Sequence, residues 1–112
     1  MKNLIRAAMC LAAVWGLVAF PAHASETIVT GHILQTQGHG SPSCRMVELQ
    51  TTSGSVIWFR IMEVSNNDDG ILAVTLTALS TGKLVDIDYD PSQTSGCGTE
   101  PRILWISIHN TN

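Results

Sequence analysis

The sequence predicts an all-β fold with one helix, in which five strands close into a small barrel. Segments of alternating apolar and polar residues recur along the chain, as is typical of half-buried strands. After the third such segment the apolar spacing changes from two to about 3.6 residues, which indicates a helix. Two cysteines, Cys44 and Cys97, lie far apart in the sequence, where a disulfide would fasten so small a domain.

The first residues have the composition of a targeting segment. Two basic residues precede an apolar run over 7–20, and Ala-His-Ala at 22–24 supplies the small residues that a signal peptidase reads. At about 14 residues, the apolar run is shorter than the ~20 needed to span a bilayer. We therefore expect a cleaved signal peptide over 1–24, with cleavage between Ala24 and Ser25. The expected location is periplasmic or secreted, with no transmembrane segment in the mature chain.

The remaining residues, 25–112, are enough for one domain only. They carry four basic and nine acidic side chains, a formal charge of −5. A negative domain is a poor match for nucleic acid, whose phosphates are bound by lysine and arginine, so we expect no nucleic acid as partner. With Cys10 removed in the signal peptide, the even cysteine count predicts one disulfide, between Cys44 and Cys97.

Three strands are predicted before the helix. The first, over 26–37, is rich in β-branched residues and includes Gly31 as a bulge or bend. The second, over 45–51, alternates between apolar and polar side chains. A hairpin turn at 52–55 then leads into a third strand over 56–64.

A helix is predicted over 71–81. The polar residues at 65–70 offer several N-cap candidates, and carboxylates there complement a helix N-terminus. Gly82 is placed to end the helix in the left-handed conformation. One apolar stripe is predicted from three leucines, spaced by four and three residues, together with the residues that flank them: Leu72, Leu76 and Leu79 with Ile71, Thr75 and Ala78.

Two further strands complete the predicted order β-β-β-α-β-β. Over 85–90 apolar residues alternate with three aspartates, and 91–98 is a turn-rich loop. The last strand, over 102–109, is predicted to bury three aliphatic residues: Leu104, Ile106 and Ile108. In under about 100 residues this is the order of the OB-fold, a five-stranded Greek-key barrel, with the helix plugging one end.

Several segments carry a family resemblance. They are Gly-His-Ile at 31–33, Cys44, Trp58, Thr-Gly-Lys at 81–83 and Val-Asp-Ile-Asp-Tyr at 85–89. In these the chain resembles the small secreted B subunits of bacterial AB5 toxins, in the subtilase-cytotoxin and pertussis-like branch. The resemblance implies an OB-fold, a homopentameric ring, a separate catalytic subunit and binding to a host or cell-surface glycan. The chain lacks the N-terminal extension that carries a serine of the sugar site in the subtilase branch, so that site is not carried over.

The alternating aspartates resemble the start of a calcium-binding loop, but the pattern fails. Asp86, Asp88 and Asp90 have the opening spacing of an EF-hand. Its sixth position requires glycine and is Pro91, and its twelfth requires glutamate and is Cys97. We therefore predict the solvated face of a strand, beside which a cation would be favourable.

The sequence indicates neither a metal site nor an active site. The histidines that remain after cleavage (32, 39 and 109) lack the spacing of zinc ligands. No Gly-x-Ser-x-Gly nucleophile elbow is present, and the even cysteine count leaves no free thiol. We expect no metal, no cofactor and no enzymatic activity.

Trp58, Arg60 and Trp105 are the candidate ligand or partner surface. Each tryptophan lies on the strand face opposite an aliphatic one, and Arg60 shares the face of Trp58. Tryptophan beside arginine is suited to stacking on a sugar ring or gripping a partner, although packing in the core or between subunits would also explain both rings. The leading hypothesis is an exported, non-enzymatic binding domain similar to the glycan-binding B subunits. The alternative is a periplasmic structural or interaction protein that binds protein partners.

Overall fold

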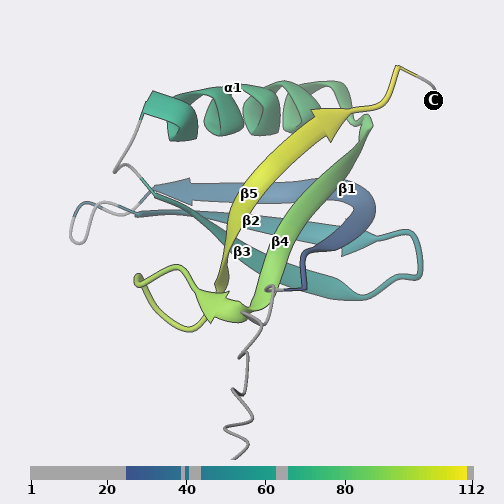
Figure 1. Cartoon of the computed structure of the whole chain (residues 1–112). Coiled ribbons are helices and arrows are strands. Elements are labelled where there is room, and N and C mark those ends of the chain that lie inside the picture. Colours follow the sequence, from purple (N-terminus) through teal and green to yellow (C-terminus); the bar gives the residue numbers. More distant parts are fainter. Residues whose placement is uncertain (1–24, 39, 41–43, 63–65, 111–112) are drawn as a thin grey trace, which may run out of the picture.

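The computed structural model describes residues 25–38, 40, 44–62 and 66–110 of the chain. The expected signal peptide and its cleavage site reach outside this part. Within it, five strands and one helix follow one another in the predicted order (Figure 1). Their bounds are β1 Thr27–Gly38, β2 Cys44–Thr51, β3 Val56–Met62, α1 Asn66–Thr81, β4 Leu84–Thr94 and β5 Pro101–Ile108.

The strands form a closed barrel in the order β1-β2-β3-β5-β4. The long strand β1 pairs antiparallel with β2 through one half and with β4 through the other, which closes the ring. The β3–β5 contact is parallel and is registered at one pair, Arg60 with Arg102. The predicted fold class, an OB-fold-like Greek-key barrel with one helix, is confirmed.

Gly31 is the point at which β1 passes from one neighbour to the other. It is registered with Thr51 on β2 and with Val85 on β4. A Cβ at this position would collide with the backbone carbonyl of Gln50, so the close approach of the strands requires glycine. Of the two predicted alternatives, a bulge or a bend, the bulge is not at Gly31, because the register of β1 with β2 shifts at Leu34.

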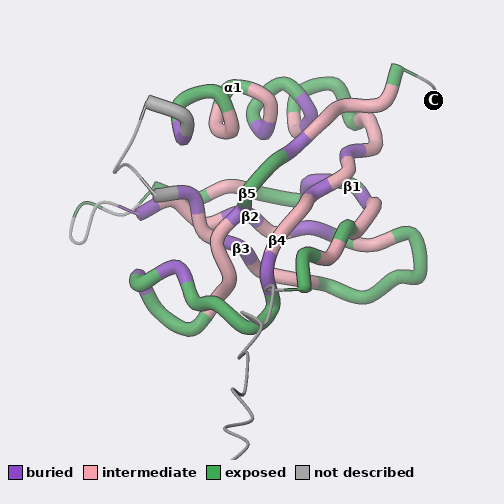
Figure 2. The backbone as a smooth tube through the Cα atoms, in the orientation of Figure 1, coloured by how far each residue is buried: buried purple, intermediate pink, exposed green. Residues whose placement is uncertain are grey.

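The inward side chains of the barrel form one continuous apolar core. Figure 2 colours the buried residues purple along the backbone. The rings of Phe59 and Tyr89 meet edge to face with centroids 4.9 Å apart. The alternation predicted for the second, third and fourth strands is confirmed by the residues that are fully buried there: Val47, Leu49, Phe59, Ile61, Val85 and Ile87.

The helix α1 begins at Asn66, a turn earlier than the predicted start at residue 71. Asp68 and Asp69 therefore lie in its first turn, where carboxylates complement the positive end of the helix dipole. The predicted end is confirmed. Gly82 has φ 67° and donates its N–H to the carbonyl oxygen of Ala78 at 2.9 Å, a left-handed cap.

The face of α1 that packs on the barrel is the predicted stripe, except at Leu76. Thr75 and Ala78 are buried, and Leu72 and Leu79 are partly buried against the core. Leu76 is 46% exposed, so its predicted place in the stripe is wrong. The small residues Thr75 and Ala78 lie at the centre of the packed face, and the Thr75 hydroxyl donates to a carbonyl of the preceding turn at 2.8 Å.

The pairing of β4 with β5 contains a bulge that the alternation did not predict. Trp105 is registered with Asp88 and Ile103 with Tyr89, so Leu104 is an extra residue. Ile103 is consequently fully buried and Leu104 is 44% exposed. The predicted burial of Leu104 is wrong, because the extra residue reverses which side chains face inward.

Candidate functional site

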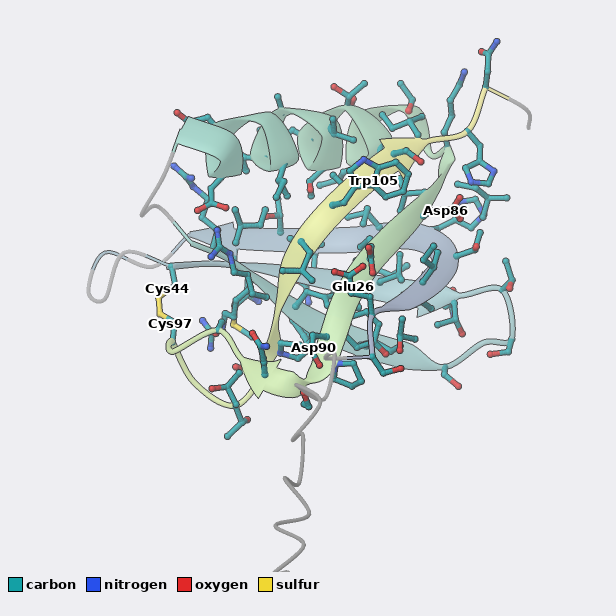
Figure 3. The ribbon with its side chains drawn as sticks, viewed as in Figure 1. Glu26, Cys44, Asp86, Asp90, Cys97 and Trp105 are labelled. Atoms are coloured by element: carbon teal, nitrogen blue, oxygen red, sulfur yellow. A yellow bond between two sulfur atoms is a disulfide. The ribbon has the colours of Figure 1, made fainter. Side chains whose placement is uncertain are left out.

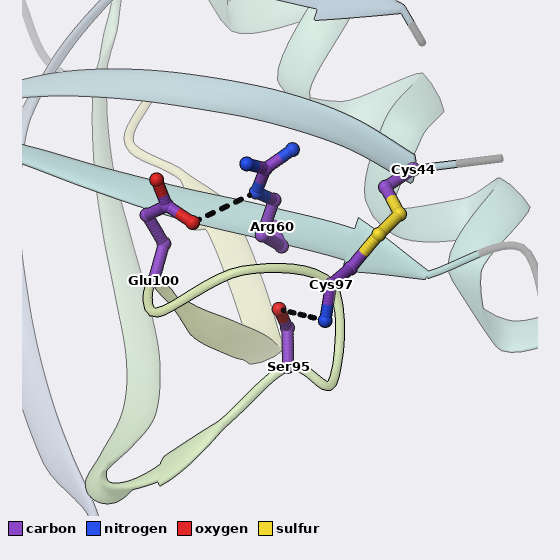
Figure 4. The surroundings of a disulfide bond; sticks show 5 residues. All are labelled: Cys44, Arg60, Ser95, Cys97 and Glu100. Atoms are coloured by element: carbon purple, nitrogen blue, oxygen red, sulfur yellow. Dashed lines mark hydrogen bonds and ion pairs between the residues drawn. A yellow bond between two sulfur atoms is a disulfide. The ribbon is translucent and has the colours of Figure 1, made fainter. Parts of the chain in front are cut away.

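The predicted disulfide between Cys44 and Cys97 is confirmed. It joins the start of β2 to the loop over 95–100, with Cα atoms 6.5 Å apart, and both cysteines are buried (Figure 4). The loop is closed by the Ser95 N–H, which donates to the Glu100 carbonyl oxygen at 3.1 Å. Within the described residues, no helix has the length and apolar character to cross a membrane.

Arg60 is engaged with its own chain. Its Nε donates to Glu100 Oε2 at 3.0 Å, and its side chain is only 12% exposed (Figure 4). The backbone N–H of Glu100 and then the Arg60 guanidinium hold the pKa of the Glu100 carboxyl below its usual value. The geometry therefore gives Arg60 a role in fixing the disulfide loop against β3.

The two candidate tryptophans lie on different parts of the barrel. Arg60 on β3 is registered with Arg102 on the parallel strand β5. Trp58 lies two residues before Arg60, and Trp105 lies three residues after Arg102. At ~3.3 Å per residue, the two positions are roughly 15 Å apart along the strands. Trp58 is half-buried, whereas Trp105 is 50% exposed. The three predicted surface residues thus do not form one site, and Trp105 is the accessible one.

Asp86 is the most fully partnered carboxylate of the aspartate stripe on β4. It accepts a hydrogen bond from the Thr30 hydroxyl at 2.6 Å, and His109 Nε2 lies 2.8 Å from its other oxygen. The Thr30 hydrogen bond, followed by that of His109, lowers the pKa of the Asp86 carboxyl. In the part of the chain that the structure describes, no group of three or more candidate ligands is placed to hold a metal.

Asp88 lies between two exposed apolar side chains on the outer face of the barrel. It is registered with Ile28 on β1, 65% exposed, and with Trp105 on β5. Its Oδ1 is buried and has no hydrogen-bond partner in the described chain. With the bulged Leu104, these residues form the Trp105 face: Ile28, Asp88, Leu104 and Trp105.

Next to the Trp105 face, β4 separates from β5 and opens a small cleft. Between the pairs Tyr89–Ile103 and Thr94–Pro101, β4 advances by five residues whereas β5 changes by only two. The cleft has a volume of about 130 Å³. We call it the bulge cleft, lined by Asp90, Gln93, Thr94, Arg102 and Leu104.

Two polar side chains of the bulge cleft are only partly satisfied. Asp90 is 4% exposed, and its Oδ1 accepts from the Ser92 N–H at 2.8 Å and from the Ser92 hydroxyl at 2.6 Å. Arg102 Nη2 donates to Asp68 Oδ1 at 3.2 Å, which ties β5 to the first turn of α1. Asp90 Oδ2 and Arg102 Nε are buried without a partner in the described chain, and such groups are uncommon in folded proteins.

The sequence did not reveal the bulge cleft. Gln93 and Thr94 fall in the predicted loop, whereas β4 continues past Pro91 to Thr94. The sequence pattern identifies Asp90 only as the last carboxylate of the aspartate stripe on β4. The Asp-Pro-Ser sequence at 90–92 is a turn signal that could have shown Asp90 bonding locally rather than facing solvent. Figure 3 shows Asp86, Asp90 and Trp105 on the adjoining strands β4 and β5.

Comparison of the chain with protein-family models, with curated proteins and with solved structures finds no match. The outer face of β4 and β5 is therefore the candidate functional site. This surface offers an exposed indole ring, carboxylate oxygens and a small polar cleft. It can hold a ligand by stacking and hydrogen bonding.

Proposed function

We propose that this chain is an exported, non-enzymatic binding domain, similar to the glycan-binding B subunits of AB5 toxins, whose Trp105 face contacts a carbohydrate. The half-exposed Trp105 is the observation that carries the proposal. An indole ring on an outer barrel face provides an apolar platform for a pyranose, and its N–H donates to a hydroxyl. Asp88, registered beside Trp105, is partly exposed and carries a carboxylate, which accepts hydrogen bonds from sugar hydroxyls.

The charge of this face supports an uncharged polyol over an anionic ligand. Asp86, Asp88 and Asp90 follow one another at alternate positions of β4, and Arg102 beside them is already paired with Asp68. Carboxylates accept hydrogen bonds from hydroxyls and repel phosphates. A neutral glycan surface is therefore favoured over nucleic acid.

Binding by a B subunit implies assembly into a homopentamer that carries a catalytic subunit. Light scattering coupled to size-exclusion chromatography measures the mass of the mature chain directly. We expect a mass about five times that of the subunit, as for a homopentamer. Ring assembly places several weak sugar sites on one surface and so multiplies their avidity. A monomer that gives no signal on a glycan array would contradict the proposal.

Trp105→Ala tests the binding face itself. We expect this variant to lose glycan-array binding by at least about tenfold, because stacking on an indole ring contributes on the order of 1 kcal/mol per ring and is multiplied by avidity. Trp58→Ala is the matched control, since its half-buried ring lies away from the Trp105 face. Equal glycan binding by wild type and Trp105→Ala would remove this face from the proposal.

A second candidate function is a periplasmic structural or interaction protein that binds a protein partner. It is favoured by three exposed apolar side chains on β1 and β5, the two strands that flank β4, which are 65%, 44% and 50% exposed: Ile28, Leu104 and Trp105. Such clusters mark protein-binding surfaces. A monomeric chain without glycan binding, whose partner capture is abolished by Ile28→Glu, would establish this function instead.

A further inference from the structure

We infer that the Trp105 face binds a sugar that carries a free amino group. The sugar ring stacks on the Trp105 indole, and the ammonium group lies beside the Asp88 carboxylate. This ligand class rests on the carbohydrate-binding function proposed above and narrows it. The inference is carried by the pairing of Asp88 with Trp105 and by the absence of a countercharge for Asp88 among the described residues.

Asp88 and Trp105 are direct cross-strand neighbours on the outer face of the barrel. They are registered with one another on β4 and β5, and such pairs have Cβ atoms about 4.5–5.5 Å apart. Trp105 is half-exposed, and Asp88 is partly exposed. Asp88 Oδ1 is buried, and Oδ2 is the carboxylate oxygen that reaches the surface. A pyranose ring on the indole therefore has its substituents within reach of Asp88 Oδ2.

Asp88 has no cationic partner in the part of the chain that the structure describes. Two basic side chains of the β5 segment are engaged with other carboxylates. His109 Nε2 lies 2.8 Å from Asp86 Oδ2, and Arg102 Nη2 donates to Asp68 Oδ1 at 3.2 Å. The negative charge of Asp88 is therefore left for a ligand.

The surroundings of the Asp88–Trp105 pair are acidic. Asp86 and Asp90 lie two residues to either side of Asp88 on β4, roughly 7 Å away along the strand (Figure 3). The carboxylates that disfavour an anionic ligand attract a cation, and residues 25–112 carry a formal charge of −5. The face of an indole ring attracts a cation as well. A glycan with an ammonium group is therefore stabilised more than the same glycan without one.

The apolar side chains of the Trp105 face favour a sugar ring over a simple amine. Asp88 lies between Trp105 on β5 and Ile28 on β1, and Ile28 is 65% exposed. A pyranose offers its C–H groups to these two side chains while its hydroxyls stay hydrated. A flexible aliphatic amine contacts mainly the carboxylate. The ligand class is therefore an amino sugar, such as an oligomer of glucosamine.

A matched pair of trisaccharides tests the proposal on the oxidised mature chain by NMR titration. Chitotriose has free amino groups, and tri-N-acetylchitotriose differs from it only by the acetyl groups that remove their charge. At low salt and slightly acidic pH, we expect chitotriose to bind at least about fivefold more tightly and to shift the indole N–H signal of Trp105. The preference should shrink in about 0.5 M salt, because surface charges are then screened. Equal affinities at low salt would overturn the proposal.

Spermidine is the control for charge without a sugar ring. It carries as many amino groups as chitotriose and has no pyranose to stack on an indole. We expect spermidine to bind at least about fivefold more weakly than chitotriose, because it lacks the ring contact with Trp105. Equal binding of the two compounds would overturn the assignment of an amino sugar.

Asp88→Asn is the decisive protein variant. It removes the charge and keeps the shape of the side chain, and its amide oxygen still accepts from hydroxyls. We expect its affinity for chitotriose to fall at least about fivefold, while that for tri-N-acetylchitotriose stays within about twofold. Glu48→Gln is the control, because it removes one carboxylate from β2, which neighbours neither β4 nor β5. An undiminished preference for chitotriose in folded Asp88→Asn would refute the role of Asp88.

Failure of the amino-sugar proposal and failure of the carbohydrate proposal give different results. Equal binding of the two trisaccharides that Trp105→Ala weakens would overturn the amino-sugar proposal alone. Glycan-array binding without any binding of chitotriose would do the same. No binding of either trisaccharide, together with no signal on a glycan array, would overturn both.

Discussion

The β2–β3 pairing and the β4–β5 pairing are built from similar residues and differ in regularity. β2 and β3 are registered without a shift from Cys44–Met62 to Gln50–Val56. β4 and β5 shift register twice, first at Leu104 and again before the Thr94–Pro101 pair. The first pairing supplies fully buried core residues, whereas the second combines core residues with an exposed aromatic ring and a polar cleft.

The difference shows how a small barrel can separate stability from binding. A regular ladder satisfies its backbone groups and sends alternate side chains into the core. A bulge redirects side chains and leaves polar atoms without partners. The unpartnered atoms Asp88 Oδ1, Asp90 Oδ2 and Arg102 Nε all belong to β4 or β5. We therefore expect substitutions in the regular pairing to change stability, and substitutions around the bulge to change ligand binding.

Removal of the disulfide is expected to have the largest effect on stability, because it connects the two regions. Cys44 begins β2, and Cys97 lies in the loop that links β4 to β5. Closing a loop of about 54 residues restricts the unfolded chain by about 4 kcal/mol in the chain-entropy description. The double variant Cys44→Ser/Cys97→Ser should lose free energy of unfolding of this size in urea titrations of the oxidised protein and the variant. A loss below about 1 kcal/mol would show that the loop is held by its other contacts.

Leu49→Ala is the next largest expected effect and tests the regular pairing. Leu49 is fully buried on β2, opposite Ile57. Truncation of a buried leucine removes apolar contacts and leaves a cavity, so we expect a loss of about 3 kcal/mol in free energy of unfolding. Chemical denaturation measures the loss, and glycan binding should persist in the fraction that remains folded. A loss of binding in folded protein would contradict the separation of the two regions.

The features that the sequence predicted are those determined by nearby residues. Alternation over a few positions was sufficient for β2 and β3, whose pairing is regular. Gly82 predicted the end of α1, because only a left-handed residue makes that cap without strain. The disulfide followed from the number of cysteines. Each of these inferences depends on local conformation or on counting, and not on the register between distant strands.

The features that the sequence did not predict depend on distant partners. The exposure of Leu104 results from the register of β5 against β4. Leu76 is exposed whereas Thr75 and Ala78 of the same stripe are buried, a difference that depends on how α1 lies on the barrel. Arg60 was expected on a binding surface, but its partner Glu100 comes from a loop 40 residues away. The unpartnered atoms of the bulge cleft arise only once both strands are in place.

Thr30→Val tests the outer face of β4 through its pH dependence. The Thr30 hydrogen bond lowers the pKa of Asp86 in the folded state. The stabilisation from this hydrogen bond is therefore complete above the ordinary carboxyl pKa of about 3.8, and it is lost as the pH falls through the lower pKa of Asp86 in the folded state. We expect Thr30→Val to cost about 1 kcal/mol at neutral pH, and the difference from wild type to shrink as the pH falls below the ordinary value of about 3.8.

The control for this measurement is Thr36→Val, the same change at another half-buried position of β1. Its effect on the free energy of unfolding should not depend on pH between about 3 and 7, because no carboxylate accepts from Thr36 in the described chain. Urea denaturation at several pH values measures both variants. A cost of Thr30→Val that grows as pH falls would contradict the role assigned to the Thr30–Asp86 hydrogen bond.

Leu104→Ala is expected to have the smallest effect and tests the bulge directly. If β5 alternated regularly, Leu104 would be buried and its truncation would cost about 2–5 kcal/mol, as expected for Leu49→Ala. Because the bulge exposes 44% of Leu104, we expect a loss of only about 0.5 kcal/mol in urea denaturation. Ile103→Ala is the matched neighbour, and its full burial predicts a loss of about 3 kcal/mol. A larger loss for Leu104→Ala than for Ile103→Ala would mean that the register of β5 is the regular one, in which case the bulge cleft would not exist.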